Sequence, residues 1–145
     1  MTIYNIFIFN RYGTLLYYED WRPRVDRMPL DQEAKLLFGA LYSLKGFVSK
    51  ISPVEIQEGL KCFKTNEYMM TLFESPTGLQ FVMNTDVQSA DIRELLTTIY
   101  TQAFVEHVVK NPLLNPAEPI QSDIFRQKLN ELVAKHPAAR ATNIL

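Results

Sequence analysis

The sequence has few of the residues that enzyme and metal sites require. Its 145 residues include one cysteine, two histidines and five glycines. A single cysteine, Cys62, excludes both an internal disulfide and a zinc site built from several thiolates. We expect Cys62 to be a small core residue in a strand, with lipidation or redox chemistry as the less usual roles.

Catalytic motifs are equally scarce. Neither His107 nor His136 has a second metal ligand at helical spacing, so we expect a partly buried His107 and a helix-end His136. The glycines are scattered singly, which argues against a glycine-rich phosphate loop or a dinucleotide fingerprint. No serine lies in a nucleophile-elbow context. The sequence therefore predicts no enzyme, no cofactor and no metal site.

Charge and hydropathy exclude further classes. The net charge is −1, so no general attraction to nucleic acid or acidic membranes is expected. The only basic cluster, Arg22, Arg24 and Arg27, is either a solvated loop or a site for an acidic partner. No apolar run approaches the ~20 residues of a membrane span, and no basic leader precedes the run 6–9. We expect a cytosolic chain whose membrane contact is at most peripheral.

The length and the 47% hydrophobic content fit one packed domain, which we place at residues 1–137 with a flexible tail at 138–145. Alternating apolar residues, turn signals and helix caps predict the order ββαβββαα. The strands are expected at 3–9, 14–18, 59–65, 68–74 and 79–84, and the helices at 29–50, 89–110 and 122–135.

The first strand, IYNIFIF, is apolar at both alternating positions, so both of its faces should be covered. The helix at 29–50 lies between two groups of hairpin strands. Together these features predict an α/β (α+β) fold with a five-stranded, mainly antiparallel sheet and helices on both faces.

The helix at 29–50 has two apolar stripes. One has the spacing that covers a sheet and consists of Ala34, Leu37, Phe38, Leu41, Leu44, Val48 and Ile51. The second recurs on a different side and consists of Leu36, Ala40, Ser43 and Phe47. Because the chain offers one sheet, the second stripe either meets another protein or is ordinary exposed surface.

The apolar faces of the second and third predicted helices can pack against each other. The helix at 89–110 has a broad apolar face: Ile92, Leu95, Leu96, Ile99, Ala103, Phe104, Val105, Val108 and Val109. The helix at 122–135 offers Ile124, Phe125, Leu129, Leu132 and Val133 to cover it. In the strand at 68–74, Met70 is expected in the core, while Met69 is the candidate for a flexible binding surface.

Several stretches in order carry a family resemblance. They are IYNIFIFNRYG, YYEDW, LLFGALYSLKGFVSKISP, FESPTGLQFVMNTD and FVEHVVKNPL. The sequence resembles the subunit 1 family of the TRAPP vesicle-tethering complex, a group of small longin-like proteins. The likeness covers the chain from its start to the end of the last predicted helix. The loop at 22–28 and the tail after Pro137 do not match, so neither segment gains a role from it.

The resemblance implies a longin-like fold with strand order 2-1-5-4-3, one helix on one face and two on the other. It also implies a non-catalytic core subunit of a hetero-oligomer that tethers vesicles between the endoplasmic reticulum and the Golgi. That complex would be the guanine-nucleotide exchange factor for a Rab GTPase and would associate peripherally with the cis-Golgi and endoplasmic reticulum. The alternative is another longin-fold trafficking subunit, such as a clathrin-adaptor small chain or a sedlin-like adaptor.

In such complexes the first helices of paired subunits lie on a shared platform. The implied partner-interface candidates on this chain are Leu36, Ala40, Ser43 and Phe47, with Lys45 and Lys50 nearby.

Overall fold

The computed structural model describes residues 3–21, 28–54, 62–87, 92–113, 115 and 118–135. Its elements are β1 (Ile3–Phe9), β2 (Leu15–Asp20), α1 (Leu30–Ile51), β3 (Cys62–Lys64), β4 (Met69–Glu74), β5 (Gln80–Thr85), α2 (Ile92–Thr98), the π-helix η1 (Ile99–Val109) and α3 (Asp123–Lys135). The order ββαβββαα is confirmed, since η1 continues α2. The arginine cluster, His136, the predicted strand and helix starts at 59–61 and 89–91, and the tail lie outside the described residues.

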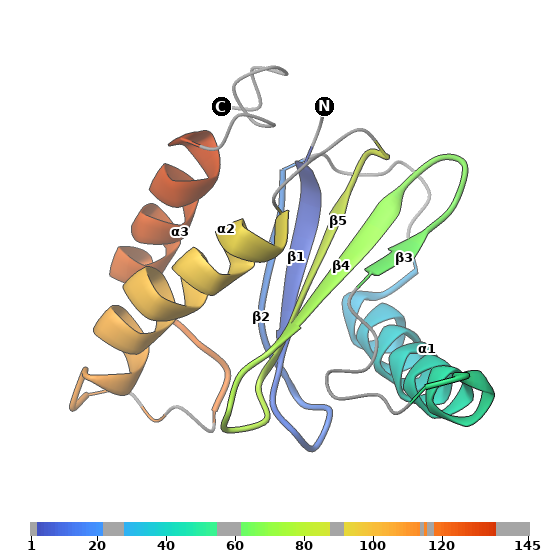
Figure 1. Cartoon of the computed structure of the whole chain (residues 1–145). Helices are drawn as coiled ribbons and strands as arrows, with labels where there is room; N and C mark the ends of the chain where they lie inside the picture. Colours follow the sequence, from blue (N-terminus) through green and yellow to red (C-terminus); the bar gives the residue numbers. More distant parts are fainter. Residues whose placement is uncertain are drawn as a thin grey trace.

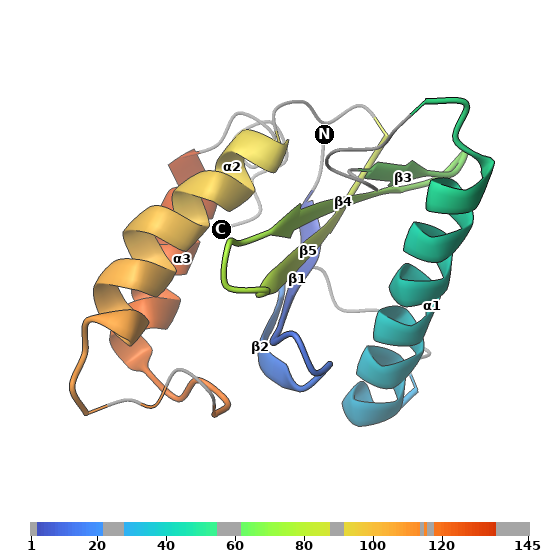
Figure 2. The same ribbon diagram turned by 60° about the horizontal axis from the view of Figure 1, so that its bottom comes forward.

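The five strands form one sheet in the order β2-β1-β5-β4-β3, and every neighbouring pair is antiparallel. Strand β1 has neighbours on both sides and helices above and below, which explains why it is apolar on both faces. Helix α1 lies against one face of the sheet, and α2, η1 and α3 lie against the other (Figures 1 and 2). The predicted fold class and helix placement are therefore confirmed.

The β1–β2 turn requires a glycine and contacts α1. The side-chain oxygen of Asn10 accepts hydrogen bonds from the backbone N–H groups of Tyr12 and Thr14, each at 2.9 Å. Gly13 has φ +89°, a conformation that costs other residues free energy. A Cβ on Gly13 would also lie 2.9 Å from the ring of Phe38 in α1. The turn therefore packs directly on the first helix.

The larger core lies between the sheet and the α2–η1–α3 layer. Phe104 of η1 contacts Phe81 of β5 and Phe125 of α3 edge to face, at ring distances of 5.8 and 6.4 Å. The backbone N–H of Lys110 donates to the carbonyl of Val105, the i→i+5 pattern of a π-helix. Most of the apolar face predicted for these helices is buried here. Three members of it are not: Val109 is 50% exposed, Ile124 is 60% exposed, and Val105 is half-buried.

The smaller core lies under α1. Ala34 and Leu41 are buried against Phe7, Phe9, Leu72 and Val82, which come from β1, β4 and β5. Of the stripe predicted to cover the sheet, Ile51 is the exception, because it is 61% exposed at the end of the helix.

Two strand predictions are wrong. Cys62 is exposed in β3, because β3 is a three-residue strand at the edge of the sheet rather than part of its centre. The methionine assignment is reversed: Met69 is 8% exposed in the larger core, whereas Met70 is only partly buried under α1. The alternation in the sequence correctly placed the two methionines on opposite faces of the sheet. It could not predict which face the helices bury more completely.

Candidate protein-interaction surface

Helix α1 presents an apolar side to solvent. Leu36 and Phe47 are 63% and 59% exposed, and Ala40 and Ser43 between them are also exposed. These four residues follow one another at spacings of four, three and four. They therefore lie along one side of the helix, which turns by ~100° per residue. We call them the α1 stripe.

The two predicted lysines lie in different places. Lys45 is two residues from both Ser43 and Phe47, which puts it about 200° around the helix from each. Its Nζ lies 3.4 Å from an oxygen of Glu74 in β4, so Lys45 belongs to the contact between α1 and the sheet. Lys50 is exposed and lies one turn from Phe47, beside the α1 stripe. The structure thus brings five of the six predicted residues together and separates Lys45 from them.

Two glycines extend this exposed side. A Cβ on Gly39 or Gly46 would meet no atom within 4 Å, and neither has a positive φ. Glycine inside a helix costs roughly 0.5–1 kcal/mol relative to alanine, and no contact in the described part of the chain requires it at either position. Together with Ala40 and Ser43 they make a surface that a partner backbone can approach closely. Both glycines are visible in the sequence at these positions, but a search for periodic apolar side chains ignores glycine.

Ile51 lengthens the stripe beyond its predicted end. It follows Phe47 by four residues and so lies on the same side of α1, one turn further on. Tyr42, 76% exposed, lies on another side of the same helix. Large apolar side chains that gather on one element of the surface are typical of protein-interaction sites.

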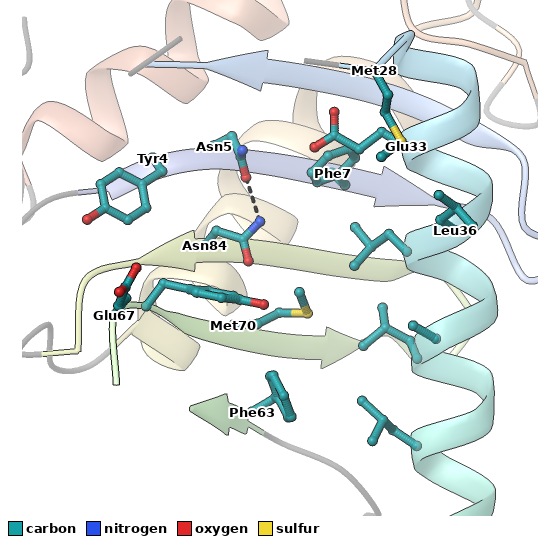
Figure 3. A pocket seen from close by; sticks show the side chains of 15 residues that line it. Tyr4, Asn5, Phe7, Met28, Glu33, Leu36, Phe63, Glu67, Met70 and Asn84 are labelled. Atoms are coloured by element: carbon teal, nitrogen blue, oxygen red, sulfur yellow. Dashed lines mark hydrogen bonds between the residues drawn. The ribbon is translucent and has the colours of Figure 1, made fainter. Parts of the chain in front are cut away.

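A groove runs between α1 and the sheet, with a volume of about 820 Å³. Leu36 and Ala40 of the α1 stripe form part of its wall, and Phe7 and Met70 form part of its floor. Figure 3 shows α1 along one side and the side chains of the strands beneath. The α1 stripe is therefore continuous with the mouth of this groove.

In the described ranges, no three His, Cys, Asp or Glu side chains come together in a way that could hold a metal ion. Half-buried His107 lies on η1, across the sheet from α1. On that face too, burial and the nearby Glu19 carboxylate raise the pKa of the Tyr17 hydroxyl, which donates to Glu19 at 2.8 Å. What the exposed side of α1 offers chemically is apolar contact area.

Among the helices of the described residues, none combines the length and the apolar character that crossing a membrane requires.

The sheet order and the division of the helices define a longin-type α+β domain with an exposed apolar first helix. A solved structure described as "MglB with tetrameric arrangement" has the same fold, with a TM-score of 0.50 and 16% identity over 72% of this chain and 76% of that chain. At this identity the likeness establishes the fold alone.

The chain belongs to the Sybindin-like family, whose profile matches residues 3–136. Trafficking protein particle complex subunit 1 of Rattus norvegicus is 41% identical over 144 residues, covering 97% of this chain and 99% of the relative. The protein of the same name from Dictyostelium discoideum is 39% identical over 138 residues, covering 94% and 97%. Trafficking protein particle complex subunit BET5 of Saccharomyces cerevisiae is 26% identical over 139 residues, covering 91% and 83%. The resemblance read from the sequence is confirmed.

Proposed function

We propose that this chain is a non-catalytic core subunit of a trafficking protein particle complex and that it binds its neighbours through the α1 stripe. One observation carries the proposal: Leu36 and Phe47 remain more than half exposed on a helix that buries Ala34 and Leu41 against the sheet on another side. Membership of the family supports it, because the relatives are named as subunits of such complexes.

The α1 stripe has enough unburied area to contribute substantially to binding. Complete burial of a Leu or Phe side chain is worth ~1.5–3 kcal/mol, and more than half of each is still available. The two side chains together would therefore contribute roughly 2–3 kcal/mol on association. Gly39, Ala40 and Gly46 add little area, but they allow a partner helix to approach within the usual ~8–10 Å.

The complex would act as a guanine-nucleotide exchange factor for a Rab GTPase in transport from the endoplasmic reticulum to the Golgi. Exchange of this kind needs no acid, base or nucleophile from the factor. It requires tighter binding of the nucleotide-free GTPase than of the nucleotide-bound form, and each 1.4 kcal/mol of difference shifts the equilibrium about tenfold. A subunit that contributes a shaped apolar surface is sufficient. The chain would reach the cis-Golgi and endoplasmic reticulum peripherally, through its complex.

The test is release of a fluorescent GDP analogue from a Rab GTPase by the complex reconstituted with this chain, with the chain omitted, and with Phe47→Asp. We expect exchange with the wild-type chain and strongly reduced exchange in the other two. Ile124→Asp is the matched control, because Ile124 is 60% exposed and lies on α3, across the sheet. Full exchange without this chain would contradict the proposal. Normal assembly of Phe47→Asp without exchange would assign the stripe to the GTPase instead of a sister subunit.

A further inference from the structure

Two turns lie side by side at one end of the sheet (Figure 1): one joins β1 to β2, and the other joins β4 to β5. A Cβ on Gly78 would lie 2.9 Å from the Cβ of Arg11, so the two turns are in contact. Each turn is closed by a backbone hydrogen bond. The N–H of Gly13 donates to the carbonyl of Asn10 at 3.1 Å, and that of Gly78 donates to the carbonyl of Ser75 at 3.0 Å. The backbone that carries Arg11 is therefore held on two sides.

One side of α1 borders both turns. Phe38, Tyr42 and Lys45 follow one another at spacings of four and three, so they share this side of the helix. Phe38 packs on the first turn, where a Cβ on Gly13 would lie 2.9 Å from its ring. Lys45 pairs at 3.4 Å with Glu74, the last residue of β4 before the second turn. Tyr42 lies between these two contacts and is 76% exposed, so its ring projects at the corner between α1 and the turns.

The first turn presents an arginine in a defined position. Arg11 and Tyr12 are both exposed, Tyr12 at 74%. Arg11 Nη2 donates to the Tyr12 hydroxyl at 2.8 Å, and the guanidinium carbon lies 5.0 Å from the centre of the Tyr12 ring. A guanidinium at this distance from an aromatic ring gains a cation–π attraction in addition to the hydrogen bond. An arginine held in this way loses less rotamer freedom on binding than an unrestrained one.

The charge of Arg11 is not offset within the described part of the chain. Its one polar partner there is the Tyr12 hydroxyl, and none of the ion pairs includes it. Glu74, the carboxylate beside the second turn, pairs with Lys45. On the same side of α1, Asp31 and Lys35 lie one turn apart and offset each other. The guanidinium therefore keeps N–H donors for an outside acceptor, and its planar fork matches a carboxylate.

We propose that Arg11, Tyr12 and Tyr42, which we call the turn surface, bind an acidic segment of another protein. A carboxylate of that segment accepts two hydrogen bonds from Arg11, and apolar side chains beside it pack on the two exposed tyrosine rings. Arginine and tyrosine are the residue types that most often dominate the binding energy of protein interfaces. A membrane surface fits less well, because a single uncompensated arginine on a chain of net charge −1 attracts anionic lipid only weakly.

The turn surface is separate from the α1 stripe. Tyr42 lies at least ~100° around the helix from every residue of that stripe, so both surfaces can be occupied at once. The inference does not rest on membership of the tethering complex and is tested on the free chain.

The experiment is a titration of the isotope-labelled full chain, followed by nuclear magnetic resonance. The probe is the capped peptide acetyl-Ala-Glu-Leu-Phe-Glu-Ala-amide. We expect saturable shifts of the Arg11 Nε–H signal and of the backbone signals of Tyr12 and Tyr42. Affinity should fall as salt is raised, because the ion pair is exposed. Replacing both Glu residues of the peptide by Lys, or both Leu and Phe by Ala, should weaken binding at least tenfold.

Variants of the chain separate a carboxylate site from a general effect of charge. Arg11→Ala should weaken binding at least tenfold and leave the thermal midpoint nearly unchanged, because Arg11 is exposed. Arg11→Lys should recover only part of the loss, since lysine keeps the charge but lacks the planar fork. Arg126→Ala is the matched control: it removes the same charge from an exposed position on α3, where Arg126 pairs with Glu19 at 3.3 Å. Arg126→Ala and Phe47→Ala should bind as the wild type does.

Several results would overturn the proposal. They are no saturable shift at millimolar peptide, equal affinity for the Glu and Lys peptides, or equal losses for Arg11→Ala and Arg126→Ala. Tighter binding of phosphatidylserine vesicles than of the peptide would assign the turn surface to a membrane instead. Shifts of the same signals when the chain alone is concentrated would assign it to a second copy of this chain.

Discussion

Phe47→Asp is the substitution that most directly tests the exposed side of α1. Phe47 is 59% exposed, so folding removes less than half of its ring from water. A fully buried Phe is worth ~1.5–3 kcal/mol, so the lost burial costs about 1 kcal/mol. A carboxylate near the C-terminal end of a helix adds roughly 0.3–1 kcal/mol. We therefore expect a folded domain whose midpoint falls by only a few degrees.

The effect on assembly should be larger. An aromatic side chain at the centre of an interface contributes ~2 kcal/mol or more, and the substitution would also bury an unpaired carboxylate. Together these give roughly 3 kcal/mol, or about a hundredfold weaker association. The contrast between about 1 kcal/mol in folding and about 3 kcal/mol in binding is the signature of an interface residue.

The assay compares thermal unfolding of the isolated chain with co-purification of the partner subunits. Ile124→Asp, with similar exposure but in the first turn of α3, where a carboxylate interacts favourably with the helix, should lose less stability and retain assembly. Leu41→Asp, at a position that is 1% exposed, should unfold the chain and marks the behaviour of a true core residue of α1. If Phe47→Asp unfolds like Leu41→Asp, or if it both assembles and supports nucleotide exchange like the wild type, the reasoning from exposure is refuted.

The remaining predictions concern α1 and the parts of the fold that support it. Gly13→Ala should cost about 2 kcal/mol or more in urea unfolding, because φ is +89° and the new Cβ would lie 2.9 Å from Phe38; an unchanged midpoint would mean the turn adapts freely. Gly46→Ala should stabilise the isolated chain by roughly 0.5–1 kcal/mol, since the new Cβ would meet no other atom. The same substitution should weaken partner binding if a partner backbone packs closely on α1. A loss of stability would contradict the open surroundings of Gly46. Trp21→Phe should cost about 1–2 kcal/mol by removing the 2.7 Å hydrogen bond from Nε1 to Asn130 Oδ1, measured by circular dichroism during urea unfolding, and no change would show that water replaces it.

The strands and helices followed from local chemistry. The alternation of side chains along the sequence located β1. Gly78, with φ +92°, ends the predicted turn, and its N–H donates to the carbonyl of Ser75 at 3.0 Å. Ser122 caps α3 as expected, its hydroxyl accepting the N–H of Phe125 at 3.3 Å. These features depend on neighbours within a few residues, so the sequence specifies them directly.

The candidate surface was only partly accessible from sequence. The apolar period of α1 located Leu36, Ala40, Ser43 and Phe47, because side chains three and four apart share one side of any helix. The same period already puts Lys45 on another side of the helix, and the structure adds that Lys45 contacts Glu74 of β4. The apolar period overlooked Gly39 and Gly46, whose importance appears only once their surroundings are seen to be open.

The sequence by itself determined the element order, the burial of both faces of β1 and the existence of a second apolar side on α1. Each of these follows from the periodicity of apolar residues and from the residue types in the turns. Only the tertiary structure decided which apolar residues remain in water. Met69 and Met70 are neighbours in one strand, yet one lies in the larger core and the other in the groove, because three helical segments cover one face of the sheet and a single helix covers the other. Cys62 is exposed for the same kind of reason: β3 is an edge, and position within a sheet is a non-local property.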